Sequence, residues 1–476
     1  MALEEDKLLL EMKKLAANER LWKKGDRIVA AVSGGPDSMA LLHLLSRIAD
    51  TGEITVIAAH VNHGFRKEAS AHEAEVVRRY AEELGVLFEM AVFDLPAYIE
   101  ETKRNGQAAA REKRYQFFHE VADRHDASLI ALAHHGDDQA ETVLMRVIRG
   151  AGLTGISGMA VKRNEKNVEL IRPMLRMNKL DILRYCSELG IPYCLDSSNN
   201  ERYYFRNVIR LDVLPYLSQF NPQLSHSLRR LADVAGAEDE WMEQQAKERF
   251  AGLVTSTPDE CTVRCRDLNG LHVALQRRLI KLILNYLAKE TDSPSFEHIE
   301  TMRLAADQNA QSTWRFDAGF GVRCVREYDY MRWISVSNAI ENDQVASYSY
   351  SVSGEMEQQW VEAGEWSLSF THHTAGDKLK PTGRHEVCLD AGKIVFPLVV
   401  RNRRQGDRIH VLGLNGSKKV QDMFVDEKIP PSMREIYPLL FDAEDRLLWI
   451  PGIRRSSHAL TDADTTDFLF IRLANE

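Results

Sequence analysis

The chain has 476 residues, 44% of them hydrophobic, and a formal net charge of −9. At about 150 residues per domain, this length predicts about three domains, each with an ordinary hydrophobic core. The negative charge excludes a uniformly basic nucleic-acid-binding protein, although it is compatible with a basic stripe on an acidic body.

The N-terminal part, residues 1–217, alternates short apolar runs with segments of helical periodicity. An amphipathic helix over 7–22 comes first. The pattern then predicts strands over 26–33, 53–63, 86–94 and 128–135, followed in turn by helices over 37–48, 69–84, 108–125 and 138–150. This alternation predicts an α/β domain with a parallel sheet, in which ligands bind where the strands end. The loops at those ends are Ser33–Ser38, His60–His63, Asp94 onward and His134–Asp138.

The pattern changes twice further along the chain. A helix over 178–190 closes the first part, and helical patterns over 221–250 and 275–290 predict a helix-rich second domain, residues 218–340. A polar, serine-rich stretch over 337–359 is expected to be a linker. Short β-like runs broken by Gly and Pro then predict a small α+β C-terminal domain, residues 341–476.

The cysteines and the N-terminus indicate where the protein works. Six cysteines are too sparse for a disulfide scaffold, so we expect free thiols, buried or partly buried. Cys261 and Cys265 lack a second Cys/His pair at zinc spacing. The N-terminus carries acids where a signal peptide needs a basic segment, and no apolar run approaches the ~18 residues of a membrane span. We therefore expect a cytoplasmic protein that does not bind membranes.

The stretch "SGGPDS" follows the first predicted strand. Two glycines let backbone N–H groups approach a ligand closely, and the helix that follows adds its positive N-terminus. A loop of this kind can hold a phosphate, yet it lacks the lysine that ends a kinase-type loop. Asp37 in its place suits a loop that holds Mg²⁺ or shapes a nucleotide. The alternative is a plain strand-to-helix turn. The loop residues are Ser33, Gly34, Gly35, Pro36, Asp37 and Ser38.

A second group of charged residues follows the fourth predicted strand, in "AHHGDDQAE". Asp137 and Glu141 are four apart at a helix start, so we expect their carboxylates to share a face. Two acids there can hold an ammonium group and later take its proton. Capping of the helix by one of the acids is an alternative. A metal site of the His-Asp type is another, but it needs further ligands that the sequence does not offer at a suitable spacing.

Arg111 and Arg114 lie near the start of the third predicted helix, where the helix dipole favours acids. A ligand-binding role and a solvated surface position are equally compatible with this pattern.

These stretches together resemble a known family. "SGGPDS" resembles the PP-loop of the ATP-pyrophosphatase superfamily, whose enzymes split ATP between the α- and β-phosphates. "HVNHGFR", "AAAREKRY" and "HHGDDQAETVLMRVIRGAGLTGISGM" resemble the tRNA(Ile)-lysidine synthetase family within it. The resemblance continues through "IRPML", "DSSN", "RNVIR", "RNRRQGDR" and "KKVQDMFVDEKIP", and so covers nearly the whole chain.

The resemblance implies a reaction and its participants. Such enzymes join lysine to C2 of the wobble cytidine in a CAU-anticodon tRNA(Ile), through an adenylated tRNA, and release AMP and pyrophosphate. ATP and Mg²⁺ are implied, with Asp37 as the metal ligand. The implied catalytic residues are Asp37, Arg111, Asp137 and Glu141. The implied ATP contacts are the six loop residues with His60 and His134. The implied substrate contacts in the first domain are Asp137, Asp138, Glu141 and Arg206.

The C-terminal domain carries a local excess of basic residues. The segment from Arg401 to Arg434 has eight Lys and Arg against four acids, which on an acidic chain suits contacts to tRNA phosphates. We expect tRNA contacts from Arg403, Arg404, Arg408, Lys418 and Lys419. The alternative for each single residue is a solvated position.

Other functions are less well matched. A tRNA thiolase needs paired reactive cysteines and a glutamine-dependent ligase needs an amidotransferase cysteine, and neither is apparent. A non-catalytic tRNA-binding protein would have a degenerate loop, whereas every expected group of the loop is present. The sequence leaves the oligomeric state open, a homodimer included.

Overall fold

The computed structural model describes residues 2–62, 64, 67–103, 106–195, 202, 204–288, 294–336, 347–354, 358–364, 366–374, 381–411 and 416–474. The chain forms two compact units, Met1–Trp241 and Met242–Glu476. The boundary between them falls inside helix α11 (Leu224–Leu253), so one continuous helix contributes residues to both units.

The first unit is built on a six-stranded sheet with the order β3-β2-β1-β4-β6-β5. All neighbouring strands are parallel except β5, which pairs antiparallel with β6 at one edge. The strands are β1 (Asp26–Ala31), β2 (Ile54–Asn62), β3 (Leu87–Val92), β4 (Leu129–Ala131), β5 (Lys162–Glu165) and β6 (Val168–Ile171). The four strands expected from the sequence are present, which confirms the predicted parallel α/β fold.

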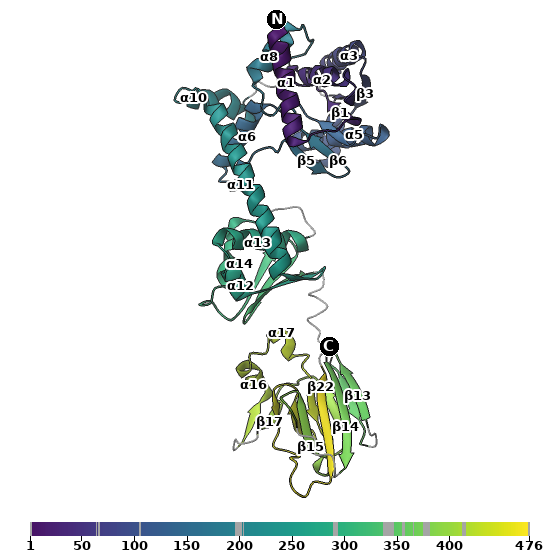
Figure 1. The fold of residues 1–476 in the computed structure, drawn as a ribbon, viewed down its shortest axis with the longest axis vertical. Helices are drawn as coiled ribbons and strands as arrows, with labels where there is room; N and C mark the ends of the chain where they lie inside the picture. Colours follow the sequence, from purple (N-terminus) through teal and green to yellow (C-terminus); the bar gives the residue numbers. More distant parts are fainter. Residues whose placement is uncertain are drawn as a thin grey trace. The chain divides into compact units, whose positions relative to one another are not determined.

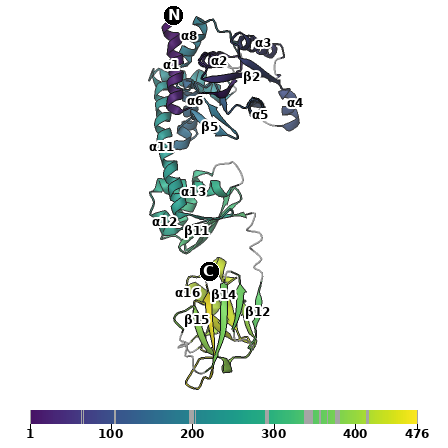
Figure 2. The ribbon, with the colours of Figure 1, turned by 45° about the vertical axis from the view of Figure 1, so that its right-hand side comes forward.

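Helices cover both faces of this sheet (Figures 1 and 2). Because successive strand residues point to opposite faces, Ile28 of β1 packs into the core beneath α1, α2 and α8, whereas its neighbour Val29 packs into the core beneath α5. The helices are α1 (Ala2–Glu19), α2 (Pro36–Ala49), α3 (Lys67–Glu83), α4 (Leu95–Thr102), α5 (Gly106–Arg124), α6 (Gly136–Ile148), α7 (Leu153–Ile156), α8 (Lys179–Glu188), α9 (Phe205–Val208) and α10 (Leu214–Ser218), with a π-helical turn over Ile209–Val213.

The strand order reverses at β1. The chain runs outward from β1 to β2 and β3, and then returns to place β4 on the other side of β1. In open α/β sheets the crevice at such a reversal, outside the carboxyl ends of the two central strands, is where ligands bind. The loops after β1 and β4 therefore meet at the position that this fold class reserves for a ligand.

The second unit begins with a helical region, as the sequence predicts. α11 is followed by α12 (Cys265–Asn269), α13 (Val273–Leu287) and α14 (Phe296–Ala305). These helices pack on a five-stranded antiparallel sheet that the sequence analysis did not anticipate, with the order β7-β8-β11-β10-β9. Its strands are β7 (Thr255–Ser256), β8 (Glu260–Arg264), β9 (Thr313–Gly319), β10 (Val322–Glu327) and β11 (Tyr330–Ser335). They are two to seven residues long and mostly alternate apolar with polar residues, a weaker signal than that of the adjacent helices.

The C-terminal part contains the strands expected of a small α+β domain, and they form antiparallel sheets. One sheet has the order β12-β16-β19-β20-β21 and another has the order β13-β14-β22-β15, with a core that both sheets line. Strand β12 lies inside the serine-rich stretch predicted to be a linker. The strands are β12 (Ser349–Val352), β13 (Gln358–Ala363), β14 (Trp366–Thr374), β15 (Glu386–Asp390), β16 (Leu398–Arg401), β17 (Arg408–His410), β18 (Ser417–Lys419), β19 (Leu439–Phe441), β20 (Leu447–Ile450), β21 (Arg454–Arg455) and β22 (Asp467–Ala474), with helices α16 (Val420–Asp426) and α17 (Pro431–Arg434).

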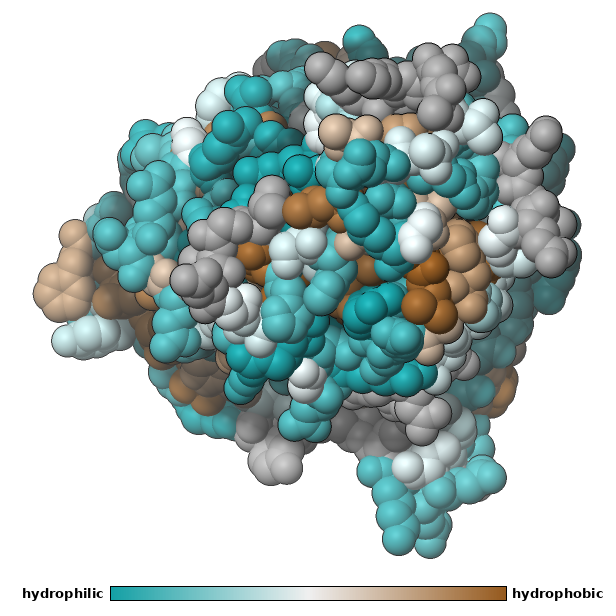
Figure 3. Space-filling view, turned by 90° about the horizontal axis from the view of Figure 1, so that it is seen from below, coloured by the Kyte–Doolittle hydropathy of each residue, from teal (hydrophilic) through white to brown (hydrophobic). Residues whose placement is uncertain are grey.

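The surface and the thiols agree with the composition. On the face drawn in Figure 3, hydrophilic side chains predominate and hydrophobic ones form small separate areas. Within the described ranges, no helix combines the length and the apolar character that crossing a membrane requires. All six cysteines are free, and five of them are buried while Cys194 is partly exposed, which confirms the expectation of unpaired thiols.

Candidate active site

The loop after β1 is held in shape by its own serines. Ser38 Oγ accepts a hydrogen bond from the Ser33 backbone N–H (3.1 Å) and donates one to the Gly35 carbonyl (2.9 Å). Gly34 has φ +91°, a conformation that favours glycine. Gly35 caps α2, which starts at Pro36 without a side-chain cap on its first N–H groups. These amide groups and the helix N-terminus therefore form a cradle suited to an anion.

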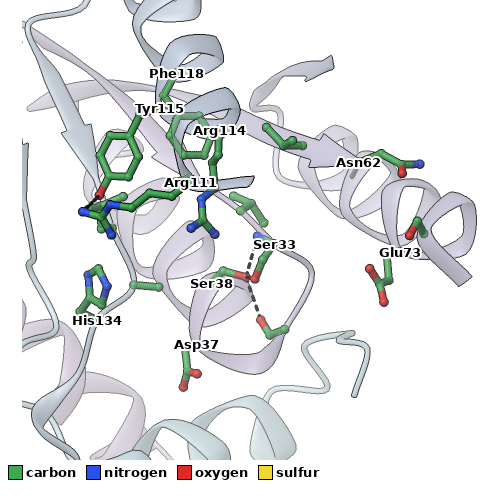
Figure 4. A pocket seen from close by; sticks show the side chains of 17 residues that line it. Ser33, Asp37, Ser38, Asn62, Glu73, Arg111, Arg114, Tyr115, Phe118 and His134 are labelled. Atoms are coloured by element: carbon green, nitrogen blue, oxygen red, sulfur yellow. Dashed lines mark hydrogen bonds between the residues drawn. The ribbon is translucent and has the colours of Figure 1, made fainter. Parts of the chain in front are cut away.

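A cavity of about 440 Å³ opens on this loop. Ser33, Gly35, Asp37 and Ser38 line it from the loop. Helix α5 lines it with Arg111, Arg114, Tyr115 and Phe118. In Figure 4 the Arg114 guanidinium is directed towards the loop, and the Arg111 guanidinium lies beside the Tyr115 hydroxyl, on the side of His134. Further lining residues include Asn62, Ser70, Glu73 and His134. Both arginines therefore lie at the ligand cavity rather than on a plain solvated face.

Arg111 and Arg114 differ in their surroundings. The Arg111 guanidinium lies 4.7 Å from the centre of the Tyr115 ring and within 3.4 Å of its hydroxyl. Arg114 is more buried, and this burial lowers the pKa of its guanidinium. The sequence analysis did not identify Tyr115. The sequence carries a signal for it, because Tyr115 follows Arg111 by four positions and residues four apart on a helix share a face.

His134 and His60 have polar ring atoms without partners. In the described part of the chain, His134 Nδ1 and His60 Nε2 are buried and make no hydrogen bond. Burial lowers the pKa of His134 to about 4, although Asp138 opposes the shift. Burial also lowers the pKa of His60, whose Nδ1 lies 2.9 Å from the Val32 carbonyl oxygen. Both rings are therefore neutral near pH 7. Of the two, only His134 is among the residues that line the cavity.

The loop after β4 is packed against the start of α8. His135 caps α6, with Nδ1 accepting from the Asp137 N–H (3.3 Å), while the Asp138 carboxylate accepts from the His135 N–H (3.1 Å). The Gly136 N–H donates to the Met177 carbonyl (2.8 Å). A Cβ on Gly136 would lie 2.8 Å from that carbonyl and 2.4 Å from Arg229 Nη1, so a side chain has no room here. The loop is thus fixed from both sides.

Asp138 and Glu141 form a cluster with two arginines. Arg206 donates to Glu141 (2.7 Å) and to Asp138 (3.1 Å), and Arg210 donates to the same two carboxylates (2.5 and 3.1 Å). Glu141 is 2% exposed. Burial would raise the pKa of Asp138, but His135 and Arg206 outweigh it and lower this pKa. Arg210 was missed in the sequence analysis, although its spacing of four from Arg206 in "RNVIR" is a usable signal.

Asp137 has a different partner from Glu141. Its carboxylate accepts a hydrogen bond from the backbone N–H of Lys179 at the start of α8 (2.8 Å). The two carboxylates, expected to share a face, are therefore engaged by different partners: Arg206 and Arg210 engage Glu141, and the start of α8 engages Asp137.

Asp37 is paired with a residue that the sequence analysis did not consider. Lys179 Nζ lies 2.5 Å from Asp37 Oδ1, and His135 Nε2 lies 3.7 Å from the same oxygen. In Figure 4 the Asp37 carboxylate lies beyond the loop, away from Arg111 and Arg114. Lys179 and Asp37 are 142 positions apart in the chain, so local spacing carries no signal for this contact.

The oxygen ligands at the cavity fit a magnesium ion better than a metal held by protein alone. Asp37 lines the cavity and already holds a cationic group. Among the residues that the structure describes, no group of three or more His, Cys, Asp or Glu side chains is placed to hold a metal. Mg²⁺ is typically bound by one or two carboxylates together with substrate phosphates and water. Asp37 fits that mode.

The basic side chains of the C-terminal segment, 401–434, differ in their exposure and in their partners. Arg401 is 2% exposed, donates to Asp407 (2.8 and 2.9 Å) and lies 3.6 Å from the Phe441 ring centre. It therefore belongs to the core and not to a surface patch, which corrects its inclusion in the basic segment. Arg403 pairs with Glu435, Lys418 pairs with Asp426, and Arg408 donates to Ser417. Arg404 and Lys419 are exposed. His63 and the "DSSN" stretch, 196–199, lie outside the described residues.

Known proteins match the chain over most of its length. Family models described as the PP-loop domain, the TilS substrate binding domain and the TilS substrate C-terminal domain match residues 5–217, 264–330 and 398–470, respectively. A tRNA(Ile)-lysidine synthase from Bacillus subtilis (strain 168) is 35% identical over 437 residues, which span 92% of this chain and 91% of that protein. The Geobacillus kaustophilus (strain HTA426) tRNA(Ile)-lysidine synthase is 32% identical over 92% of this chain and 93% of that protein.

Among solved structures, the U34-tRNA thiolase NcsA from Methanococcus maripaludis aligns with 49% of this chain and 80% of that chain, at 19% identity and a TM-score of 0.43. The identity and coverage of the synthases, together with the three family models, confirm the family predicted from the motifs: the chain is an enzyme that belongs to the tRNA(Ile)-lysidine synthase family.

Proposed function

We propose that this enzyme joins lysine to C2 of the wobble cytidine of a CAU-anticodon tRNA(Ile), with ATP as cosubstrate. In the first step the cytidine O2 bonds to the α-phosphorus, the bond from that phosphorus to the bridging oxygen breaks, and pyrophosphate leaves. In the second step the lysine ε-nitrogen bonds to C2, the C2–O bond breaks, AMP leaves and the ammonium proton is lost. The observation that carries the proposal is the cavity at the strand reversal, with an anion cradle on one side and two arginines on the other.

The first step uses the residues around the cavity. The loop Ser33–Ser38 holds the phosphates that leave, through its N–H groups and the start of α2. Arg111, on the other side, stabilises the charge that builds on the α-phosphate in the transition state. His134 is neutral and has an unpaired Nδ1, which can accept a hydrogen bond from the nucleotide. His60 is not among the lining residues of the cavity, and its Nδ1 lies against the Val32 carbonyl oxygen just before the loop, so we assign it a supporting role.

Mg²⁺ is the second cofactor of the proposal. Asp37 would hold it together with the β- and γ-phosphates, and when bound it supplies charge neutralisation for the leaving pyrophosphate.

The second step needs a carboxylate for the incoming lysine. Its ε-ammonium has a pKa near 10.4, so a base must take a proton as the nitrogen attacks. Asp137, Asp138 and Glu141 are the candidates, and Arg206 lies among them. Asp138 and Glu141 are neutralised by arginines in this structure, so Asp137, whose described hydrogen bond comes only from a backbone N–H, is the better placed base. Lysine binding by Asp138 and Glu141 requires Arg206 or Arg210 to change partners.

Specificity for the tRNA requires contacts beyond the anticodon, because the methionine elongator tRNA carries the same CAU sequence. We assign them to residues 218–340 and 341–476, in keeping with the division into a catalytic domain, 1–217, and two recognition domains. In the last of these, Arg404 and Lys419 are exposed, with Arg403, Arg408 and Lys418 beside them. These cations can contact phosphates of the tRNA body.

The direct test is incubation of the protein with ATP, radiolabelled lysine and an unmodified CAU-anticodon tRNA(Ile). Label should become acid-precipitable, with AMP and pyrophosphate released in equal amounts. The methionine elongator tRNA is the matched control and should stay unlabelled. Binding of tRNA without label incorporation would instead favour the non-catalytic alternative, and labelling without AMP release would exclude the adenylated intermediate.

A further inference from the structure

Counted over the residues that the structure describes, the lining of the cavity lacks the net positive charge that a triphosphate needs. Its charged lining residues are Arg111 and Arg114 on one side and the carboxylates of Asp37 and Glu73 on the other, so their formal charges cancel. His134 adds no charge near pH 7, because its pKa is lowered to about 4 by burial. The two arginines come from α5, and the loop itself contributes an acid where other phosphate-binding loops contribute a lysine. The loop Ser33–Ser38 therefore has no basic side chain of its own.

Lys179 brings a cation to the loop side from another part of the chain. Its Nζ lies 2.5 Å from Asp37 Oδ1, and Asp37 is both the acid that ends the loop and a lining residue of the cavity. A lysine side chain is a flexible stem that carries a compact point charge with three donors, so a turn about its own bonds can move the ammonium from a carboxylate to a neighbouring phosphate oxygen.

The backbone of Lys179 is held in place while its side chain remains accessible. Its N–H donates to Asp137, and the preceding residues are anchored by the hydrogen bond from Gly136 to the Met177 carbonyl. The Lys179 and Asp37 side chains are 30% and 27% exposed. An ion pair this exposed adds little to folding stability. The geometry is therefore that of an ammonium on a fixed base next to a ligand cavity, which a purely structural ion pair does not require.

We propose that Lys179 supplies the phosphate-binding lysine that the loop "SGGPDS" lacks. In the ATP-free enzyme the ammonium is the counter-ion of Asp37. With ATP bound, and Asp37 engaged in holding the metal, the ammonium exchanges the carboxylate for an oxygen of the β- or γ-phosphate and stays with the pyrophosphate as it leaves. This inference rests on the proposed function for the identity of the leaving group.

The cavity then has two ends that bind different phosphates. Arg111 and Arg114 serve the α-phosphate, and Lys179 serves the two phosphates that leave. Loss of Lys179 should then weaken the binding of free pyrophosphate, which a change at the α-phosphate end would not do.

The test compares Lys179→Met and Lys179→Arg with the wild-type protein and with Lys13→Ala. Lys13 is the matched control, because it forms an exposed ion pair with Glu53 in the same unit and is not among the lining residues of the cavity. Binding of inorganic pyrophosphate is measured by calorimetry with and without Mg²⁺, alongside single-turnover formation of adenylated tRNA. Circular dichroism and thermal unfolding confirm that each variant is folded.

We expect Lys179→Met to bind pyrophosphate about 10-fold more weakly and to form adenylated tRNA correspondingly more slowly, since a hydrogen bond to a charged group is lost. Lys179→Arg should recover most of both, and Lys13→Ala should match the wild type. Wild-type affinity for pyrophosphate in a folded Lys179→Met variant would overturn the proposal, as would a wild-type protein with no affinity for pyrophosphate. If the wild type binds pyrophosphate but never labels tRNA with lysine, the proposed function fails and the assignment of Lys179 to the pyrophosphate site stands.

Discussion

Two regions of the chain are rich in charged residues. The fold brings these side chains together in one region and separates them in the other. At the carboxyl ends of β1 and β4, charged side chains from distant segments converge on one cavity: Asp37 from the loop, Arg111 and Arg114 from α5. In the segment 401–434, neighbours in sequence are separated by the fold, so that Arg401 is buried in the core while Arg404 is exposed. In this chain, a run of basic residues in the sequence therefore predicts a shared surface less well than position at the strand reversal predicts a shared cavity.

The largest effect should come from Asp37, the acid of the loop. Asp37→Asn should lower adenylation of tRNA by at least about 1,000-fold, because the loop loses the metal ligand that we propose and Lys179 loses its counter-ion. AMP release with tRNA(Ile) measures the rate, and circular dichroism should show an unchanged fold. Full AMP release by the folded variant would show that this region is not the phosphate site.

Arg111 should come next. Arg111→Ala should slow adenylation by about 100-fold while the dissociation constant for ATP changes by less than about threefold, because in the proposed first step the charge it meets develops in the transition state. Arg124→Ala is the matched control, since Arg124 lies on the same helix and pairs with Glu89 away from the cavity. Equal losses of rate and affinity would make Arg111 a ground-state contact.

Substitutions of Asp137 and Glu141 should differ in their effect on folding stability, although both residues lie on α6. Both Asp137→Asn and Glu141→Gln should raise the lysine requirement while adenylated tRNA still forms. Glu141→Gln should in addition lower the free energy of unfolding by about 2 kcal/mol, because it leaves two arginines beside a buried amide. Urea unfolding measures this difference. Failure of adenylation with unchanged lysine affinity would assign the pair to ATP or metal.

A smaller effect is expected in the C-terminal segment. The double change Arg404→Ala with Lys419→Ala should weaken tRNA binding by about 10-fold and reduce the salt dependence of the affinity, because both side chains are exposed cations. Arg401→Ala should instead lower thermal stability, since its guanidinium pairs with Asp407 in the core. A double variant that binds tRNA as well as the wild type at all salt concentrations would remove the segment from the recognition surface.

The smallest effect should be the pH dependence of ATP binding through His134. With a pKa of about 4, lowered by burial, His134 is neutral above about pH 5.5 and takes up a proton only below it. The ratio of the ATP affinities of wild type and His134→Asn should therefore change by less than about twofold between pH 5.5 and 8, and more steeply at lower pH. A step in that ratio near pH 6.5 would show that the ring titrates at its ordinary value.

What the sequence predicts well is whatever depends on local pattern. The alternation of β1, its loop and α2, and the positions of Arg111 and Arg114, follow from periodicity and turn chemistry. The contact of Asp37 with Lys179 does not, because 142 residues separate them and only the packing of α8 brings them together. The partners of Glu141 likewise depend on a segment about 65 residues away, and the sheet of β7 to β11 was missed because its short strands carry a weak apolar pattern.

Gly136 shows how a residue without chemistry can resemble a catalytic one. Any side chain there would collide with the Met177 carbonyl and with Arg229, and would push apart the loop after β4 and the start of α8. In a mutational scan scored by cell survival, this position would tolerate almost no replacement and would rank with Asp37. An essential position in such a scan therefore need not touch a substrate. Here a replacement would fail because it disturbs the close approach of two backbone segments that positions Asp137 and Lys179.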